Sequence, residues 1–249
     1  MEKYYDVIYV ANFNPIKRVD RYIRAIDRIS NKRPDYKAAL VCAAKTGSVK
    51  REVLATLESA KNRAAIDYIG GVDQAGLNVL FNKSKVNVLV SLREGANKGL
   101  AEGLFSSTPA LIIKENAGGN HLHINEMTGK IVSDSELEKN LIWFADHYDE
   151  YESQEWSLKH ISPSVSIKAL SEKIKNIELS DGGQWTKDLF AKVNSPELAY
   201  LNSSNSWLLS EREELLARFS RGGEVSNVSN FVERLQKMSN DLTNEPQCE

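Results

Sequence analysis

The sequence is poor in cysteine and contains no long apolar run. Its 249 residues include two cysteines, Cys42 within the apolar stretch ALVCAA and Cys248 near the polar C-terminus. Neither a disulfide framework nor a cysteine-based zinc site is therefore expected, and a reducing compartment fits this composition. Residues 1–10 carry charges ahead of a short apolar segment, which is typical of neither a signal peptide nor a transmembrane helix. We expect a cytoplasmic protein without a membrane span.

Excess charge of one sign is also lacking. The chain has 32 Lys and Arg against 34 Asp and Glu, so its net charge is -2. No overall field favours nucleic acid, and we expect no nucleic-acid partner. Hydrophobic residues make up 41% and charged residues 27%, as in ordinary globular proteins. The length allows one large domain, or one domain with an appendage.

Apolar strands alternate with amphipathic helices over the first 150 residues or so. Near-continuous apolar runs indicate strands, and apolar residues at helical spacing, as at Val19, Ile23 and Ile26, indicate helices. Strands are expected at YDVIYV, KAALVCAA, AIDYIGG, KVNVLVS, PALIIK and GKIV, and helices at residues 18–29, 49–61, 74–84, 97–106 and 135–148. This order predicts an α/β domain with a doubly wound, Rossmann-like parallel sheet that is covered on both faces.

The composition changes after about residue 180. The stretch LSDGGQW is typical of a linker, and the remainder is helical in places and rich in Ser, Asn and Glu. The last ten residues have the composition of a disordered tail. We therefore predict a Rossmann-like domain over residues 1–180 and a C-terminal helical extension with a disordered tail over residues 181–249.

The segment SLREGANKGLAEG places two glutamates, Glu94 and Glu102, around a glycine turn where a helix is expected to begin. Ligands of doubly wound sheets bind beyond the carboxyl ends of the strands, and a helix N-terminus there binds anions such as diphosphates. Gly95 and Ala96 let a ligand approach the backbone closely. Glu102, about one and a half turns into the helix, can accept hydrogen bonds from a ribose diol, whereas Glu94 lies on the other side of the anion.

Four blocks of the sequence, in order, resemble the retaining family 4 (group 1) glycosyltransferases of the GT-B fold. EGANKGLAE and the following STPALII resemble that family's E-G-F-G-x-x-x-x-E and G-x-P-V-V, and YVANFNPIKRVDRYIRAI resembles its opening V-G-R-x-x-x-x-K-G-x-D-x-L-I-x-A. The other two blocks are AIDYIGGVDQAGLNVLFNKSKVNVLVSLREG and ENAGGNHLHINEMTGKIV. The resemblance covers residues 5 to 150 and concerns the C-terminal, donor-binding half of that fold.

The resemblance implies a role for each matching residue. Lys17 would grip the donor diphosphate, Glu94 would lie near the transferred sugar, and Glu102 would hold the ribose. The reaction implied is transfer of a sugar from a nucleotide-diphosphate sugar to an acceptor hydroxyl with retention, in surface polysaccharide biosynthesis, without a metal or other cofactor. Backbone groups would complete the site: those at the helix mouth would meet sugar and phosphate, and a second loop would edge the base (Gly95, Ala96, Asn97, Lys98 and Gly99; Gly70 and Gly71). The Lys98 side chain could add a charge.

The chain departs from the family pattern at two positions. Asn12 stands where the family has an arginine, and Arg18 stands where it has a glycine and is expected to point away along its helix. The chain also begins where the donor-binding domain would begin, so the acceptor-binding half is missing. A fragment, a truncated product and a subunit that meets its acceptor domain in trans all stay open, as does peripheral association with the inner face of the membrane.

Other interpretations concern particular residues. A catalytically silent nucleotide-sugar-binding module would explain Asn12 and the missing half. A dehydrogenase is disfavoured because no G-x-G-x-x-G follows the first strand. His121 and His123 show no third metal ligand nearby in the sequence, so a loop role and no metal site are expected. The stretch Gly118–Asn120 either lets the backbone approach a ligand or forms a plain turn.

Overall fold

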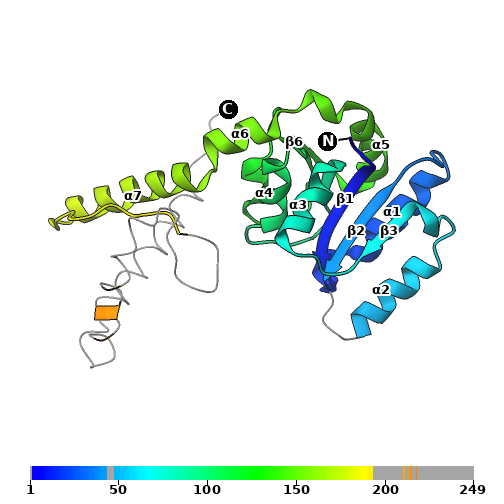
Figure 1. The fold of residues 1–249 in the computed structure, drawn as a ribbon, viewed down its shortest axis with the longest axis horizontal. Helices are drawn as coiled ribbons and strands as arrows, with labels where there is room; N and C mark the ends of the chain where they lie inside the picture. The colour runs from blue at the N-terminus through cyan, green and yellow to red at the C-terminus, as the bar shows by residue number, and fades with distance from the viewer. Residues whose placement is uncertain (1, 44–47, 193–209, 211–212, 215–216, 218–249) are drawn as a thin grey trace. The chain divides into compact units, whose positions relative to one another are not determined.

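A parallel sheet with the strand order β3-β2-β1-β4-β5-β6 forms the centre of the protein's first compact unit (Figure 1). The computed structural model describes residues 2–43, 48–192, 210, 213–214 and 217. The strands are β1 (Tyr5–Asn12), β2 (Ala38–Ala43), β3 (Ile66–Ile69), β4 (Ser84–Leu89), β5 (Ala110–Ile113) and β6 (Gly129–Val132). All five neighbouring pairs are parallel. The doubly wound sheet expected from the sequence is confirmed.

Helices of the first unit cover both faces of this sheet. The helices of the described part of the chain are α1 (Val19–Ser30), α2 (Ser48–Glu58), α3 (Gln74–Asn82), α4 (Lys98–Phe105), α5 (Leu137–His147), α6 (Ser153–His160) and α7 (Pro163–Ser180), the last of which lies mainly in the second unit. Short 3-10 helices lie between them: η1 (Pro15–Lys17), η2 (Arg63–Ala65), η3 (Gly119–His123), η4 (Asp134–Glu136) and η5 (Tyr148–Glu150). On one face α1, α2 and α5 pack on the side of Val7 and Tyr9, and on the other α3 packs on the side of Ile8. Because the inner strands β1, β2, β4 and β5 are buried on both faces, they are largely apolar, whereas the edge strands β3 and β6 are partly exposed.

The α4 helix lies on the same face as α3. A side chain at Gly99 would contact Val10 of β1, and one at Gly103 would clash with Asn87 of β4. Asn87 Nδ2 donates to the Gly99 carbonyl at 2.9 Å, so a buried amide joins β4 to the first turn of α4. The helices that follow β1 and β4 therefore leave the sheet on opposite faces.

Cys42 is a free, buried residue of β2, as expected for a reduced core thiol. Burial raises the pKa of Cys42 to about 12, which keeps the thiol protonated and unreactive at neutral pH. Cys248 lies outside the described residues. None of the helices in the described part of the chain combines the length and the apolar character that a membrane span requires.

The chain divides into two compact units, Met1–Val165 and Ser166–Glu249. In the second unit Trp185 Nε1 donates to Asp188 at 2.8 Å, and the Leu189 N–H donates to Ser171 of α7 at 3.2 Å, so this short segment packs along the helix. The domain boundary at residue 180 and the disordered tail stay predictions, since most of residues 193–249 lie outside the described part.

Candidate functional site

The sheet has a topological switch point between β1 and β4. Since α1 and α4 leave on opposite faces, the loops that follow β1 and β4 diverge at the carboxyl edge of the sheet, which is where doubly wound folds bind ligands. The β1 loop contains η1, which begins at Pro15 and is capped by Asn14, whose side chain accepts from the Ile16 N–H at 3.0 Å. This cap places Lys17 at the end of η1.

Lys17 and Glu94 meet across this switch point. The Lys17 Nζ atom lies 2.5 Å from Glu94 Oε1, and the two side chains are only 19% and 9% exposed. The backbones are joined as well, because the Leu92 N–H donates to the Ile16 carbonyl at 3.0 Å. Two residues that are 77 positions apart in the sequence, and that were assigned to one site, are thus in direct contact.

The Tyr9 side chain, on β1, links the loop that follows β1 to the loop that follows β4. Its hydroxyl donates to the Lys17 carbonyl and lies 3.1 Å from Ser91 Oγ. The ring is fully buried in β1, and burial raises the pKa of Tyr9, so the hydroxyl remains a donor at any physiological pH. Tyr9 therefore fixes the backbone of Lys17 relative to the end of β4.

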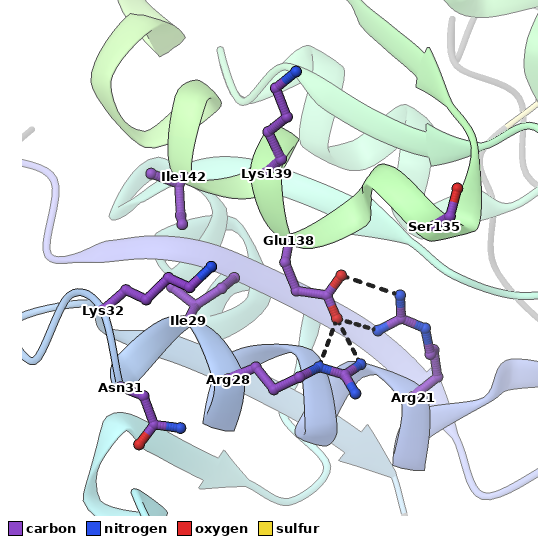
Figure 2. A pocket seen from close by; sticks show the side chains of 9 residues that line it. All are labelled: Arg21, Arg28, Ile29, Asn31, Lys32, Ser135, Glu138, Lys139 and Ile142. Atoms are coloured by element: carbon purple, nitrogen blue, oxygen red, sulfur yellow. Dashed lines mark hydrogen bonds and ion pairs between the residues drawn. The ribbon is translucent and has the colours of Figure 1, made fainter.

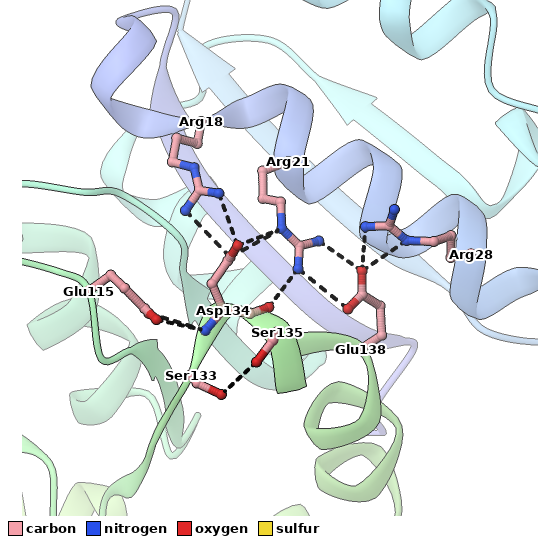
Figure 3. A network of polar contacts seen from close by, with 8 residues as sticks. All are labelled: Arg18, Arg21, Arg28, Glu115, Ser133, Asp134, Ser135 and Glu138. Atoms are coloured by element: carbon pink, nitrogen blue, oxygen red, sulfur yellow. Dashed lines mark hydrogen bonds and ion pairs between the residues drawn. The ribbon is translucent and has the colours of Figure 1, made fainter.

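Arg18 adopts a left-handed backbone conformation, with φ 52° and ψ 44°. Its guanidinium is turned toward Asp134, with Nη2 and Oδ2 3.1 Å apart (Figure 3). A non-glycine residue in this region costs roughly 1–2 kcal/mol. The arginine is therefore bound to the β6 side of the sheet and adds no charge at the Lys17–Glu94 pair.

A chain of asparagine side chains orients Glu94. Asn97 Nδ2 donates to Glu94 Oε1 at 3.2 Å, while Asn97 Oδ1 accepts from the Leu100 N–H at 2.9 Å and caps α4. The Asn97 N–H donates to Asn120 Oδ1 at 2.8 Å, and Asn120 Nδ2 donates to Asn116 Oδ1 at 3.2 Å. Asn116 and Asn120 are 3% and 1% exposed, so these hydrogen bonds are shielded from water.

Gly118 allows two loops to approach each other. Its φ is +139°, and a Cβ atom here would lie 1.6 Å from the Glu94 carbonyl oxygen. The same contact includes a hydrogen bond from the Glu94 N–H to Ala117 at 2.9 Å and one from the Gly119 N–H to Gly95 at 3.1 Å. The glycine is needed here because backbone meets backbone.

The mouth of α4 offers fewer free amides than expected. The Asn97 N–H is bonded to Asn120, and the Leu100 N–H is bonded to the Asn97 side chain. Within the described ranges the N–H groups of Lys98 and Gly99 have no acceptor. These two amides form the anion-binding end of the helix, beside the exposed Gly95 and Ala96.

Glu102 lies further along α4 and faces α3 rather than Glu94. Its Oε1 atom is 3.4 Å from Lys98 Nζ, and it lines a pocket of about 250 Å³ together with Gln74 and Asn78 of α3. Gly70 and Gly71 are exposed in the loop that leads into α3 at Gln74. The structure thus separates the assigned residues into two groups, one around Lys17 and Glu94 and one around Glu102.

Comparison with known proteins decides the family. The family model for glycosyl transferases group 1 matches residues 1–155. This chain belongs to the group 1 glycosyltransferases. No curated protein sequence matches it.

Solved structures of glycosyltransferases have the same fold. A point mutant of TarM from S. aureus is 15% identical, with a TM-score of 0.57 over 68% of this chain and 36% of TarM. Sucrose-phosphate synthase of Thermosynechococcus elongatus is 17% identical, with a TM-score of 0.60 over 70% of this chain and 45% of that enzyme. The C-terminal domain of the Francisella tularensis group 1 protein LpcC is 16% identical, with a TM-score of 0.55 over 64% of this chain and 87% of that domain. The chain thus spans less than half of the two longer proteins.

In this glycosyltransferase chain, Asn12 does not provide a second positive charge, and the surroundings of the histidines are not those of a metal site. Asn12 Oδ1 accepts from the Asn14 N–H at 3.1 Å and supplies no positive charge. In the part of the chain that the structure describes, no three His, Cys, Asp or Glu side chains gather as metal ligands. His121 Nε2 lies 3.2 Å from the Ile113 carbonyl, and burial lowers the pKa of His123. Both histidines therefore pack within the protein in the η3 loop.

Sequence reasoning missed Tyr9 and Asn116 as parts of this candidate site, and it considered Asn120 only for its backbone, within the stretch Gly118–Asn120. In the sequence, Tyr9 is one residue of a largely apolar strand segment. Asn116 and Asn120 lie in a loop in which only Gly118 and Gly119 indicate a particular backbone geometry. The one available signal was Asn120 directly after the glycine pair. Asn97 was assigned a backbone role, whereas its side chain both caps α4 and contacts Glu94.

Proposed function

We propose that this chain is the donor-binding half of a retaining glycosyltransferase, which transfers a sugar from a nucleotide-diphosphate sugar to an acceptor hydroxyl. The observation that carries the proposal is the Lys17–Glu94 contact across the switch point, beside the free end of α4. A cation, a carboxylate and two free amides at the carboxyl edge of a parallel sheet suit a ligand that joins a diphosphate to a sugar.

The diphosphate would bind to Lys17 and to the amides of Lys98 and Gly99. Lys17 is bonded to Glu94, so a diphosphate has to compete with that carboxylate for the ammonium group. Asn12 contributes no second cation, and donor binding therefore depends on Lys17 and the helix dipole. When the bond from the anomeric carbon to the diphosphate breaks, the same groups would stabilise the charge that develops on the leaving oxygen.

Glu94 and Glu102 would act on different parts of the donor. Glu94 is held by Lys17 and Asn97 at the switch point, where the transferred sugar would lie. Glu102 faces α3, and its pocket begins close to the Gly70–Gly71 loop, so ribose and base would extend toward that side. As the bond to the diphosphate breaks, a bond from the anomeric carbon to the acceptor oxygen would form on the same face, and the proton of the acceptor hydroxyl would pass to the leaving diphosphate oxygen. No metal is assigned a role.

The acceptor-binding domain would come from a partner in trans or from another part of a longer protein. The chain covers 36% of TarM but 87% of the isolated C-terminal domain of LpcC, which supports a donor half. The TarM structure contains UDP and alpha-GlcNAc-glycerol, which supports a nucleotide diphosphate as the ligand class. We propose surface polysaccharide biosynthesis as the process, in the cytoplasm or at the inner face of the membrane.

Calorimetric titration of UDP, GDP, ADP and their sugars tests the donor site. We expect one nucleotide to bind in the micromolar to low millimolar range, and Glu102→Ala to weaken it by about 1–3 kcal/mol through loss of hydrogen bonds to a charged group. Lys159→Ala, an exposed change on α6, serves as the control. Absence of binding by every nucleotide would contradict a working donor site.

Glu94→Gln gives a sharper test, because it removes the charge that holds Lys17. We expect this variant to bind the nucleotide diphosphate more tightly by about 1 kcal/mol, or about fivefold, which is the upper range for surface ion pairs and suits this largely buried one. Lys17→Met should weaken binding instead. If Glu94→Gln and Lys17→Met weaken binding equally, the ion pair does not compete with the ligand.

A catalytically silent binding module is the second candidate, favoured by Asn12. The two candidates differ once an acceptor domain is supplied. A transferase would lose turnover in Glu94→Ala while still binding the donor, and a silent module would bind the donor without transferring sugar in any form of the chain.

A further inference from the structure

A groove of about 840 Å³ lies between α1 and the start of α5, and none of the residues assigned to the donor site lines it (Figure 2). Its walls come from α1 and the residues that follow it, from Ser135 of η4 and from the first turns of α5. The half-buried Ile142 forms the apolar part of the accessible surface, and the fully buried Ile29 packs beneath it.

The charges around this groove do not balance. Arg21 and Arg28 both bind one carboxylate, Glu138, with contacts of 2.8 and 2.6 Å. Lys32 and Lys139 also line the groove, are exposed, and have no ion-pair partner within the described ranges. The lining thus carries four cationic side chains and one carboxylate, in a chain whose overall charge is -2.

Asp134 is the second carboxylate that binds arginine side chains here, and it does not offset the excess of positive charge. Asp134 binds Arg21 and also Arg18, so three guanidinium groups share two carboxylates (Figure 3). Burial alone would raise the pKa of Glu138, but hydrogen bonds from Arg21 and Arg28 hold that pKa below its ordinary value. Glu138 is therefore already ionised at neutral pH, and the count of charges holds there.

Two further features suit an anion. Arg28 is 58% exposed, so its guanidinium can turn toward a ligand and bind a phosphate in a bidentate manner. The groove lies at the N-terminal end of α5, an 11-residue helix without a side-chain cap, whose dipole adds positive potential. Because the surface is concave, it fits a small ligand better than a flat bilayer.

We propose that this groove binds a small phosphorylated molecule, with its phosphates against Arg28, Lys32 and Lys139 and its apolar or sugar portion on Ile142. The site goes beyond the proposed glycosyl transfer and does not depend on it. It is a second anion site on the unit, distinct from the switch point at Lys17 and Glu94.

The test uses sodium tripolyphosphate, titrated calorimetrically into the full chain. Lys17→Ala is the background, so that the donor site does not contribute. In this background we expect binding to persist, and Lys32→Glu with Lys139→Glu to weaken it at least tenfold. Lys61→Glu with Lys159→Glu, two exposed lysines elsewhere with the same change in net charge, should weaken it less than threefold.

Three results would overturn the proposal: no binding in the Lys17→Ala background, equal losses for the two charge-reversed pairs, or binding only to vesicles. For the last, phosphatidylglycerol and phosphatidylcholine vesicles are compared by sedimentation. Capture by phosphatidylglycerol without binding of tripolyphosphate would assign the groove to a membrane surface instead. If charge reversal lowers the melting temperature, Lys32→Gln with Lys139→Gln replaces it, and binding should still weaken severalfold.

Discussion

Replacing Gly118 by alanine should separate the two loops that build the site. The glycine has a φ of +139°, and the added Cβ atom would lie 1.6 Å from the Glu94 carbonyl oxygen. Real Cβ atoms do not approach backbone oxygens so closely, so the backbone has to move. The movement would break the contacts of Gly119 with Gly95 and of Glu94 with Ala117.

The expected loss of stability follows from these contacts. Backbone strain at a position that side chains rarely adopt costs about 1–3 kcal/mol. Two backbone hydrogen bonds contribute about 1 kcal/mol each. We therefore expect Gly118→Ala to lower the free energy of unfolding by about 4 kcal/mol, or to lower the melting temperature by roughly 10 °C for a unit of this size.

Urea unfolding and thermal melting measure this effect, with Gly119→Ala as the matched control. A Cβ atom at Gly119 would lie 3.6 Å from the Gly95 oxygen, an ordinary contact, so this variant should lose less than about 1 kcal/mol. The two substitutions add the same methyl group at adjacent positions. Equal stabilities of the two variants would refute the argument from close approach.

Three other predictions concern the surroundings of the site. Arg18→Ala should be about 1 kcal/mol less stable than Arg18→Gly in urea unfolding, since only glycine holds a φ of 52° without strain; equal stability would show that the conformation is not maintained. Asn120→Ala should cost about 2–4 kcal/mol, measured in the same way, because it removes the partners of the Asn97 N–H and of Asn116 Oδ1, while Asn116 Nδ2 keeps its hydrogen bond to the Ser91 carbonyl; a loss below about 1 kcal/mol would contradict this. Burial would raise the pKa values of Asp134 and Glu138, but hydrogen bonds from arginines hold both pKa values below their ordinary range. The stability that these carboxylates contribute is therefore present above about pH 4.5 and is lost as the pH falls through their lowered folded-state pKa values. Asp134→Asn with Glu138→Gln should make the melting temperature decline less steeply in acid.

The sheet and its helices could be predicted from the sequence because local pattern and global fold agree. Continuous apolar runs mark strands that are buried on both faces, and Val19, Ile23 and Ile26 repeat at helical spacing. Strand order needed more than pattern. The sequence predicts a doubly wound parallel sheet, whereas the order β3-β2-β1-β4-β5-β6, with β1 beside β4, depends on strand pairing and is known from the structure.

The details of the site could not be predicted because they depend on tertiary contacts. Nothing in the sequence shows that the Asn97 side chain would reach Glu94, or that Asn120 would take the Asn97 N–H. The left-handed Arg18 could be inferred only through the family's glycine. The groove between α1 and α5 arises from residues more than 100 positions apart, so no local pattern marks it.

The two halves of the proposed site follow from different properties of the chain. Lys17 and Glu94 are fixed by backbone hydrogen bonds between loops, by Tyr9 and by Asn97, so their positions are set before any ligand binds. Among the residues that the structure describes, the Glu102 carboxylate has one ion-pair contact, with the exposed Lys98 on its own helix. Preorganisation is most useful where charge develops during reaction, whereas adaptable contacts suffice for orienting a remote part of the substrate. On this argument substitutions at Tyr9 or Asn97 should impair transfer more than binding, and substitutions at Lys98 or Glu102 should do the reverse.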